Sequence, residues 1–538
     1  MSTVTTTAPG FEEVDPAVHA RRWWVLGVLC LSVMIIVMDN TILNVAIPSL
    51  IKDLNASNSQ VQWIIDSYTI VFAGLLLTTG SLSDRFGRKG ALQAGIVLFG
   101  MGSVMSALAT SANQLIATRA FMGIGGALIM PSTLSLLTNT FRDPRERGRA
   151  IAIWAGFSGV GVAAGPLIGG LLLKHYSWSS VFWVNLPIGL TALVAGFFLL
   201  PTSREDGHQK LDPLGSVLSM VGLASFLFGV IEVPDKGWGN GQVIGGFAIG
   251  IVLIIGFIVW ELHTDHPMLD MKFFKNPRFT AANTAITLTF FAMFGSLFLM
   301  TQYWQFVHGY TPLQAGIRLI PYAFGMMLVA PISARVVEAL GSKRVITFGI
   351  ATVATALVLL SFLRRDTPYI IAIIPFTLMA AGVGFTMPPA TESIMGSLPR
   401  DKAGVGSAVN DTTRQVGGAI GVALIGSIVS SIYGSRVTTA AARFGVKGAD
   451  LSEAKSSLGG GLKIAGGLTN GAVGFTNAVK DGFVNALSIG LRMSTIVVVF
   501  AGFVVWRYLP ARGVDHDHVP AATDDDIHDM IGSIAVGE

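Results

Sequence analysis

Long apolar stretches alternate with short polar connections along most of this 538-residue chain. A helix needs about 20 predominantly apolar residues to cross the hydrocarbon core of a bilayer. Stretches that meet this requirement recur fourteen times, which predicts an all-α integral membrane protein. The predicted spans are 23–47, 61–82, 91–110, 114–137, 150–173, 180–200, 214–232, 242–260, 280–301, 314–334, 344–363, 369–391, 404–432 and 485–508.

The composition supports a membrane protein and excludes several kinds of site. Asp, Glu, Lys and Arg make up only 13% of the residues, whereas soluble domains contain about 25%. Cys30 is the only cysteine, so an intramolecular disulfide and a thiolate metal site are excluded. The nine histidines fall in predicted loops and tails, so we expect no metal site. The net charge of +4 is small, and we expect no nucleic-acid partner.

The positions of the basic residues predict the orientation of the chain. Two arginines precede the first span, and most other Lys and Arg residues fall in alternate loops on the same side. Cytoplasmic loops are enriched in Lys and Arg, so we predict that residues 1–22 and the tail 509–538 are both cytoplasmic. We expect the tail to be solvated and disordered, although His516 and His518 offer an alternative interpretation as metal ligands.

The longest connection, residues 433–484, begins with an Ala-rich stretch that we expect to be helical and then becomes Gly-rich. Structureless connections of this length are uncommon in compact domains. The segment could form a gate over the outer vestibule or an extracellular surface loop that is mobile. We favour the surface loop.

The loop after the second span is similar to the loop after the tenth. GSLSDRFGRKG aligns with SARVVEALGSKRV so that Asp84 lies opposite Glu338 and Gly87 opposite Gly341. Duplicated halves with a site at their interface are a common plan of transporters. The predicted units are an N-terminal six-helix bundle at 23–200, a cytoplasmic linker at 201–213, two inserted spans at 214–260 and a C-terminal six-helix bundle at 280–508.

Several segments resemble the motifs of one membrane-protein family. GSLSDRFGRKG resembles the loop signature of the major facilitator superfamily, and WAGFSGVGVAAGPLIGG resembles its antiporter motif in span 5. MDNTILNVAIPSL resembles the span-1 signature of the fourteen-span drug:proton antiporters. RAFMGIGGAL, WIIDSYTI, SWSSVFWVNLPIGL and VNDTTRQVGGAIGVA are similar to further family segments. An acid in span 2 and the long loop before span 14 resemble the quaternary-ammonium exporters of that subfamily.

The resemblance implies a fold and a function. It implies two six-helix bundles with two extra spans, and proton-coupled export of a lipophilic, cationic small molecule by alternating access. The expected partners are protons and membrane lipids, the proton gradient replaces any cofactor, and the protein acts as a monomer in a bacterial plasma membrane. A lipid or a self-made metabolite is an alternative cargo. A membrane enzyme or scaffold is a further alternative, but the sequence contains no catalytic constellation to support it.

The loop signature places charges and glycines at the cytoplasmic ends of spans 2 and 3. The enrichment of cations in cytoplasmic loops explains its basic residues, but it does not explain Asp84 or the paired glycines. The resemblance implies a latch that holds the outward-facing state. The positions that match the motif are Gly80, Asp84, Arg85, Gly87, Arg88 and Lys89.

Span 5 carries Gly161, Gly165 and Gly169 at every fourth position. Such a stripe of small residues allows another helix to approach closely. Pro166 removes a backbone donor and can bend the helix. Simple helix packing explains the stripe as well as a direct role does. The resemblance implies that this face is where the two halves move against each other.

Asp39, Asp66 and Arg119 are charged residues inside apolar spans. A charge deep in a membrane helix costs at least about 2.5 kcal/mol to insert, so it rarely persists without a role. From the helical rise, all three lie about 8–9 Å below the outer face of the membrane. Depth alone does not show whether they touch, and an ion pair that only fixes packing is an alternative interpretation.

A pair between Arg119 and Asp39 would leave Asp66 uncompensated in a medium of low dielectric constant. A carboxyl in such a medium holds its proton more readily than one in water, and it can exchange that proton for a cation. We therefore predict that Asp66 is the main carboxylate for protons and cations, that Asp39 assists and that Arg119 tunes both.

Glu392, Asn410, Asp411 and Arg414 are secondary candidates in the second half. Glu392 lies near the cytoplasmic end of span 12, where an ordinary interfacial residue is the simpler interpretation. Asp411 and Arg414 are three residues apart, so they can pair on one helical face, and a local pair explains them as well as a transport role does. Aromatic side chains can line a cavity for a lipophilic cation, although most pack in the core or face lipid. The candidates are Trp63, Tyr68, Trp154 and Tyr322.

Overall fold

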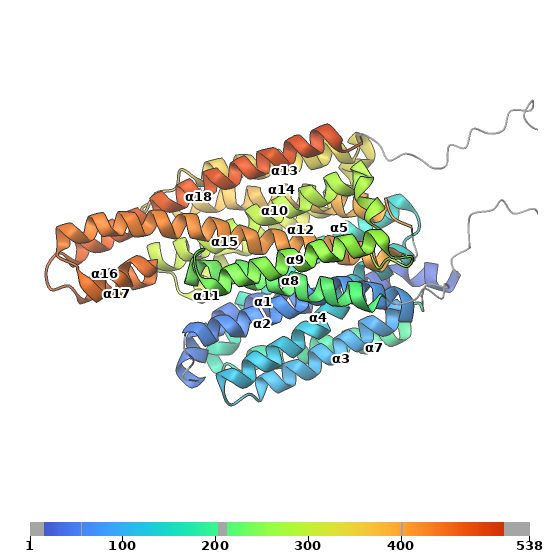
Figure 1. Ribbon diagram of the computed structural model, residues 1–538, viewed down its shortest axis with the longest axis horizontal. Helices are drawn as coiled ribbons and strands as arrows, with labels where there is room; N and C mark the ends of the chain where they lie inside the picture. Colours follow the sequence, from blue (N-terminus) through green and yellow to red (C-terminus); the bar gives the residue numbers. More distant parts are fainter. Residues whose placement is uncertain (1–15, 55, 57, 203–211, 400–401, 511–538) are drawn as a thin grey trace, which may run out of the picture.

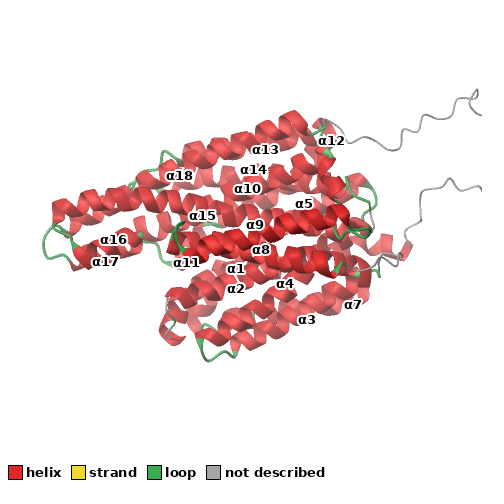
Figure 2. Ribbon diagram, in the orientation of Figure 1, coloured by secondary structure: helices red, strands yellow, loops and turns green. Residues whose placement is uncertain are grey.

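The computed structural model describes residues 16–54, 56, 58–202, 212–399 and 402–510. Most of the linker 201–213 and almost all of the tail 509–538 lie outside the described residues. Within the described ranges the chain is almost entirely helical (Figure 2). Fourteen helical stretches there are long and apolar enough to cross a membrane, which confirms the predicted spans.

The helices form two bundles and an inserted pair. The N-terminal bundle contains α1 (Pro16–Leu54), α2 (Asn58–Phe86), α3 (Arg88–Ala107), α4 (Ala112–Thr140), α5 (Pro144–His175), α6 (Ser180–Trp183) and α7 (Asn185–Leu199). The inserted pair is α8 (Pro213–Lys236) and α9 (Gly241–His263), followed by the short helix η1 (Met271–Lys275). The C-terminal bundle contains α10 (Pro277–Gln302), η2 (Tyr303–Val307), α11 (Pro312–Arg318), α12 (Ile320–Leu340), α13 (Ser342–Leu360), α14 (Tyr369–Met395), α15 (Ala403–Phe444) and α18 (Ala472–Tyr508). Two short helices, α16 (Gly448–Ser456) and α17 (Leu458–Gly467), connect α15 to α18.

The start of α1 and the end of α18 lie at the same end of the molecule, which we call the termini end (Figure 1). Helices α16 and α17 lie at the opposite end, which we call the α16–α17 end. The inserted helices α8 and α9 pack on each other, and α8 contacts both α2 and α15. The inserted pair therefore covers one side of the seam between the two bundles.

Two glycines make equivalent joints in the two bundles. Gly87, with φ of 107°, separates α2 from α3, and Gly341, with φ of 82°, separates α12 from α13. Glycine adopts positive φ without the steric penalty of a Cβ atom. The weak sequence repeat thus corresponds to a repeated structural joint.

An Asp-Pro pair sets the start of α5. The Asp143 side chain accepts hydrogen bonds from the backbone N–H groups of Arg145 (2.7 Å) and Glu146 (3.4 Å), and Pro144 occupies the first helical position. Both are favourable features of a helix N-terminus. As a result, α5 begins at Pro144 rather than at residue 150, and arginines expected in a loop lie on its first turns.

The prediction that residues 433–484 form a surface loop is wrong. Helices α15 and α18 continue into this segment, and α16 and α17 fill most of the interval between them. The Tyr433 hydroxyl donates to the backbone oxygens of Ala454 (3.0 Å) and Ser457 (3.1 Å), while Leu458 and Phe475 are buried. The helical start expected for the Ala-rich part is present as the end of α15, and the Gly residues that suggested a loop permit close packing between these helices.

Candidate functional site

The first charged centre lies inside the N-terminal bundle, where Asp39 of α1 forms an ion pair with Arg119 of α4. The Asp39 and Arg119 side chains are 1% and 0% exposed. Asp39 Oδ1 accepts a hydrogen bond from Asn185 Nδ2 of α7 (2.9 Å), and Arg119 Nε donates to the Ile64 oxygen of α2 (3.2 Å). Both carboxylate oxygens are therefore satisfied by groups of one bundle, as a buried charge requires.

Asp66 lies close to this centre along the chain of α2. It lies on α2, two residues after Ile64, and its side chain is half-buried. The carboxylate that pairs with Arg119 is that of Asp39. Of the three charges predicted at one depth, Asp39 and Arg119 thus form a buried pair, whereas the Asp66 side chain is partly exposed.

Sequence reasoning missed Asn185. Its Nδ2 atom also lies 3.1 Å from Ser103 Oγ of α3, so it links the charged centre to another helix. The signal was present, because an amide in an apolar span commonly forms hydrogen bonds between helices.

The second charged centre lies on α15 of the C-terminal bundle. Arg414 Nη1 donates to Asp411 Oδ1 (3.3 Å), so the predicted local pair is present. Asn410 Nδ2 donates to the same oxygen (3.3 Å), and Arg414 Nη2 donates to Thr391 Oγ1 of α14 (3.0 Å). All four side chains are buried.

Arg414 also meets the opposite bundle. Its guanidinium carbon lies 5.1 Å from the ring centre of Trp154 on α5 and 5.5 Å from that of Phe290 on α10. Trp154 Nε1 donates to Thr133 Oγ1 of α4 (3.3 Å), which holds the indole in the N-terminal bundle. Trp154 is therefore a predicted aromatic residue that the structure places at the seam.

The other predicted aromatics lie away from this contact. Trp63 packs against Phe228 of the inserted helix α8, with ring centres 5.8 Å apart. Tyr68 is buried inside the N-terminal bundle, where its ring centre lies 4.5 Å from the Arg119 guanidinium. Tyr322 is buried in the C-terminal bundle against Phe376, at 4.7 Å between ring centres.

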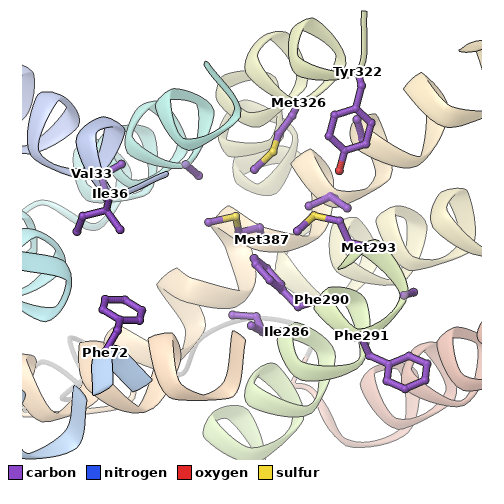
Figure 3. Packing of buried hydrophobic residues seen from close by; sticks show 14 of the residues in the cluster. Val33, Ile36, Phe72, Ile286, Phe290, Phe291, Met293, Tyr322, Met326 and Met387 are labelled. Atoms are coloured by element: carbon purple, nitrogen blue, oxygen red, sulfur yellow. The ribbon is translucent and has the colours of Figure 1, made fainter. Parts of the chain in front are cut away.

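Apolar and thioether side chains gather between the bundles. Figure 3 shows Phe290, Met326 and Met387 of the C-terminal bundle opposite Val33 and Ile36 of α1. All five are buried. Methionine and aromatic side chains adapt to ligands of different shapes, so this region is chemically suited to lipophilic molecules.

Asp84 connects the bundles at the termini end. Its Oδ1 accepts a hydrogen bond from the Gly404 backbone N–H (2.9 Å), and its Oδ2 accepts one from that of Val405 (3.1 Å). These groups belong to the first turn of α15, where the helix dipole favours a negative charge. Arg88 Nε donates to Asp84 Oδ1 (2.8 Å). A Cβ atom on Gly80 would lie 2.7 Å from the Gly404 oxygen, so glycine permits this approach of α2 to α15.

The other matched positions of the loop signature contact their own bundle. Lys89 Nζ donates to the Phe197 oxygen of α7 (2.8 Å), and the Arg85 guanidinium lies 5.4 Å from the ring centre of Phe86. Gly87 forms the joint between α2 and α3. Gly80 and Asp84 are thus the signature residues whose described contacts cross the seam.

Two ion pairs also cross the seam. Arg147 of α5 binds Glu392 of α14 through two nitrogens, with Nη2–Oε1 at 2.6 Å and Nε–Oε2 at 3.0 Å. Arg149 Nη2 lies 2.9 Å from Glu338 Oε1 of α12. Glu392 therefore has a partner in the opposite bundle, which its position near the end of span 12 did not predict. Arg147 and Arg149 were missed because the sequence placed them in a loop.

The glycine stripe of α5 faces its own bundle. Cβ atoms on Gly161 and Gly165 would lie 2.9 Å from Val37 Cβ and from the Met38 oxygen of α1. The expectation that this stripe is the face between the halves is wrong.

A different face of α5 contacts the C-terminal bundle. Gly156 and Gly159 lie against Met327 and Met326 of α12, and Pro166 lies against Gly316 of α11. With 3.6 residues per turn, these positions lie more than a quarter turn away from Gly165, the centre of the stripe.

The described residues offer no group of three or more His, Cys, Asp or Glu side chains that could hold a metal ion. Within the spans, the described residues instead supply charged side chains and buried apolar side chains.

Comparisons with known proteins identify the family. The model of the Major Facilitator Superfamily matches residues 29–422. The tetracenomycin C resistance and export protein of Streptomyces glaucescens is 35% identical over 438 residues, covering 81% of each chain. The multidrug efflux pump LfrA of Mycolicibacterium smegmatis is 33% identical over 90% of this chain and 96% of its own. The methyl viologen resistance protein SmvA of Salmonella typhimurium is 30% identical over 90% of this chain and 98% of its own.

Among solved structures, the human organic anion transporter MFSD10 (TETRAN) matches with a TM-score of 0.61 at 13% identity. It covers 91% of this chain and 100% of its own. At that identity the likeness concerns the fold alone. Together with the fourteen spans, these matches show that the chain belongs to the Major Facilitator Superfamily and is a multi-pass membrane transporter.

Proposed function

We propose that this transporter exports lipophilic, cationic compounds from the cytoplasm across a bacterial plasma membrane in exchange for protons. The observation that carries the proposal is the division of charge in the N-terminal bundle. Asp39 and Arg119 neutralise each other, and Asp66 is a half-buried carboxyl on the neighbouring helix α2. The relatives named for multidrug efflux and methyl viologen resistance support export as the direction of transport.

In this proposal the termini end faces the cytoplasm. Most Lys and Arg residues of the short loops lie on the side of the N-terminus, as the distribution of basic residues in membrane proteins predicts. The cross-bundle contacts of Asp84, Arg147 and Arg149 then close the cytoplasmic side. Alternating access requires these contacts to break when the bundles separate there.

The exchange step takes place at Asp66. Its carboxylate binds either a proton or the cationic cargo, because each neutralises the same negative charge. A cation that arrives from the cytoplasm replaces the proton, and a proton that arrives from outside replaces the cation. Asp39 remains bound to Arg119 and Asn185. Because Arg119 is paired with Asp39, it does not compete with the proton or the cargo for the Asp66 carboxylate.

Transport by purified protein in liposomes with an imposed proton gradient tests the assignment. We expect Asp66→Asn to lower proton-driven ethidium transport at least tenfold, because an amide does not exchange a proton near neutral pH. Asp481→Asn is the matched control, because the Asp481 side chain is 60% exposed at the α16–α17 end. The control should retain the wild-type rate, and a wild-type rate in Asp66→Asn would reject Asp66 as the exchanging group.

A compound made by the cell itself is a second candidate cargo. The relative in Streptomyces glaucescens is named for export of tetracenomycin C as well as resistance to it. In the same liposomes, proton flux that starts on addition of a neutral metabolite fraction and not on addition of ethidium would favour this alternative.

A further inference from the structure

The Arg414 guanidinium has unused hydrogen-bonding capacity inside the protein. It can donate five hydrogen bonds. Nη2 donates to Thr391 and Nη1 makes a long contact of 3.3 Å with Asp411, whereas Nε is buried and has no hydrogen-bond partner among the described residues. A buried donor without a partner costs about 1–3 kcal/mol, so this position favours any group that brings an acceptor.

The carboxylate that pairs with Arg414 also has an acceptor atom to which no described group donates. Asp411 Oδ2 is buried and lacks a hydrogen-bond partner in the part of the chain that the structure describes. Asp39, in contrast, uses both carboxylate oxygens. The second centre is therefore an incompletely satisfied polar group within the membrane-spanning region.

Aromatic rings from both bundles flank this polar group. Trp154 of the N-terminal bundle and Phe290 of the C-terminal bundle have ring centres 5.1 and 5.5 Å from the guanidinium carbon. Both rings are buried, and the indole is fixed by its hydrogen bond to Thr133. A separation of the bundles would move Trp154 away from Arg414 and create space between them.

The chemistry of this arrangement selects one kind of occupant. A guanidinium offers donors only and repels a cation. The flanking rings offer flat apolar faces for stacking. We propose that Arg414, Trp154 and Phe290 form a binding site for planar aromatic cargo that carries an acceptor oxygen, such as a phenolate or a carbonyl.

In this site the oxygen accepts a hydrogen bond from Arg414 Nε and the ring system stacks against the indole or the phenyl ring. The site rests on the proposed export function only in calling its occupant cargo. Its residues do not include Asp66, and their chemistry extends the substrate range from cations to molecules with a negative or neutral oxygen.

Equilibrium binding of two fluorescent probes to the detergent-purified full chain tests the proposal. Fluorescein and rhodamine 123 share a xanthene ring system, but fluorescein carries oxygens where rhodamine 123 carries nitrogens. We expect wild-type protein to bind fluorescein, and we expect Arg414→Gln to weaken that binding at least tenfold. The loss for fluorescein should exceed the loss for rhodamine 123 at least fivefold, and Arg414→Lys should not restore binding because lysine lacks the Nε donor and the planar fork.

Arg318→Gln is the matched control, because Arg318 also stacks on aromatic rings, but on those of Tyr310 (4.0 Å) and Tyr369 (5.6 Å) in its own bundle. It should leave fluorescein binding unchanged. If Arg414→Gln fails to fold, Phe290→Leu replaces it as the test variant. We expect Phe290→Leu to lower the affinity for fluorescein three- to tenfold.

Three results would overturn the proposal. They are no binding of fluorescein to the wild type, wild-type affinity for fluorescein in Arg414→Gln (or in Phe290→Leu where it replaces that variant), or an equal loss of affinity for fluorescein and rhodamine 123. These measurements need no proton gradient. A failure of proton-driven ethidium transport would therefore reject the proposed function without affecting them.

Discussion

The two buried ion pairs have the same chemistry but different surroundings. Asp39 and Arg119 lie on two helices of one bundle, and Asn185 of a third helix completes the carboxylate. Asp411 and Arg414 lie on a single helix at the seam, where Arg414 lies between aromatic rings of both bundles. A group enclosed in one bundle moves with it as a rigid unit, whereas a group at the seam changes neighbours when the bundles move. In our proposal the same residue types therefore serve packing in one place and recognition of cargo in the other.

Removal of the cation from each pair should give the largest difference. Arg119→Gln leaves Asp39 buried without its cation, so we expect the free energy of unfolding to fall by about 3–5 kcal/mol. Arg414→Gln should cost about 1–2 kcal/mol, because the contact between Arg414 and Asp411 is long, at 3.3 Å, and its loss removes less pairing energy. Denaturant unfolding in detergent micelles measures both values. Equal losses would show that the two centres do not differ in this way.

The two faces of α5 extend the comparison to glycine. Gly165→Ala should lower the free energy of unfolding by about 1–3 kcal/mol, because the added methyl would lie 2.8 Å from the Ile42 nitrogen and 2.9 Å from the Met38 oxygen. Gly156→Ala should leave stability nearly unchanged, since its nearest neighbour, the Met327 oxygen, is 3.4 Å away across the seam. Thermal unfolding of both variants measures the difference. A larger loss in Gly156→Ala would reverse the assignment of the faces.

The smallest expected effect concerns two ion pairs of similar geometry. Arg147–Glu392 crosses the seam, whereas Arg22–Glu146 lies within the N-terminal bundle. Glu392→Gln should weaken closure of the termini end by about 1 kcal/mol, and Glu146→Gln should not. Maleimide labelling of Ser407→Cys, a fully buried position near the start of α15, reports the opening in a Cys30→Ala background. We expect labelling about two to five times faster in Glu392→Gln, and equal rates in both variants would contradict a role for the seam-crossing pair.

Sequence reasoning recovered the features that depend on one coordinate along the chain. The number of spans and the common depth of Asp39 and Arg119 follow from apolar length and helical rise. The direction in which a side chain points around its helix does not follow, because a membrane helix is apolar on its lipid face as well as its core face. For this reason Asn185, the partner of Glu392 and the orientation of the α5 stripe required the structure. Arg147 required it for another reason, because the helix start at Asp143 and Pro144 lies within a polar segment.

The length of α15 has a mechanical consequence. Its 42 residues extend for about 63 Å, twice the thickness of the hydrocarbon core at about 30 Å. One unbroken rod thus joins the backbone groups held by Asp84 to the Arg414 position and to the helices at the α16–α17 end. If α15 tilts as a rigid body, a small displacement of its first turn beside Asp84 produces a larger displacement of its C-terminal end near Phe444. Binding of an antibody fragment to this C-terminal end of α15 should therefore depend on whether the termini end, at the opposite end of the molecule, is closed.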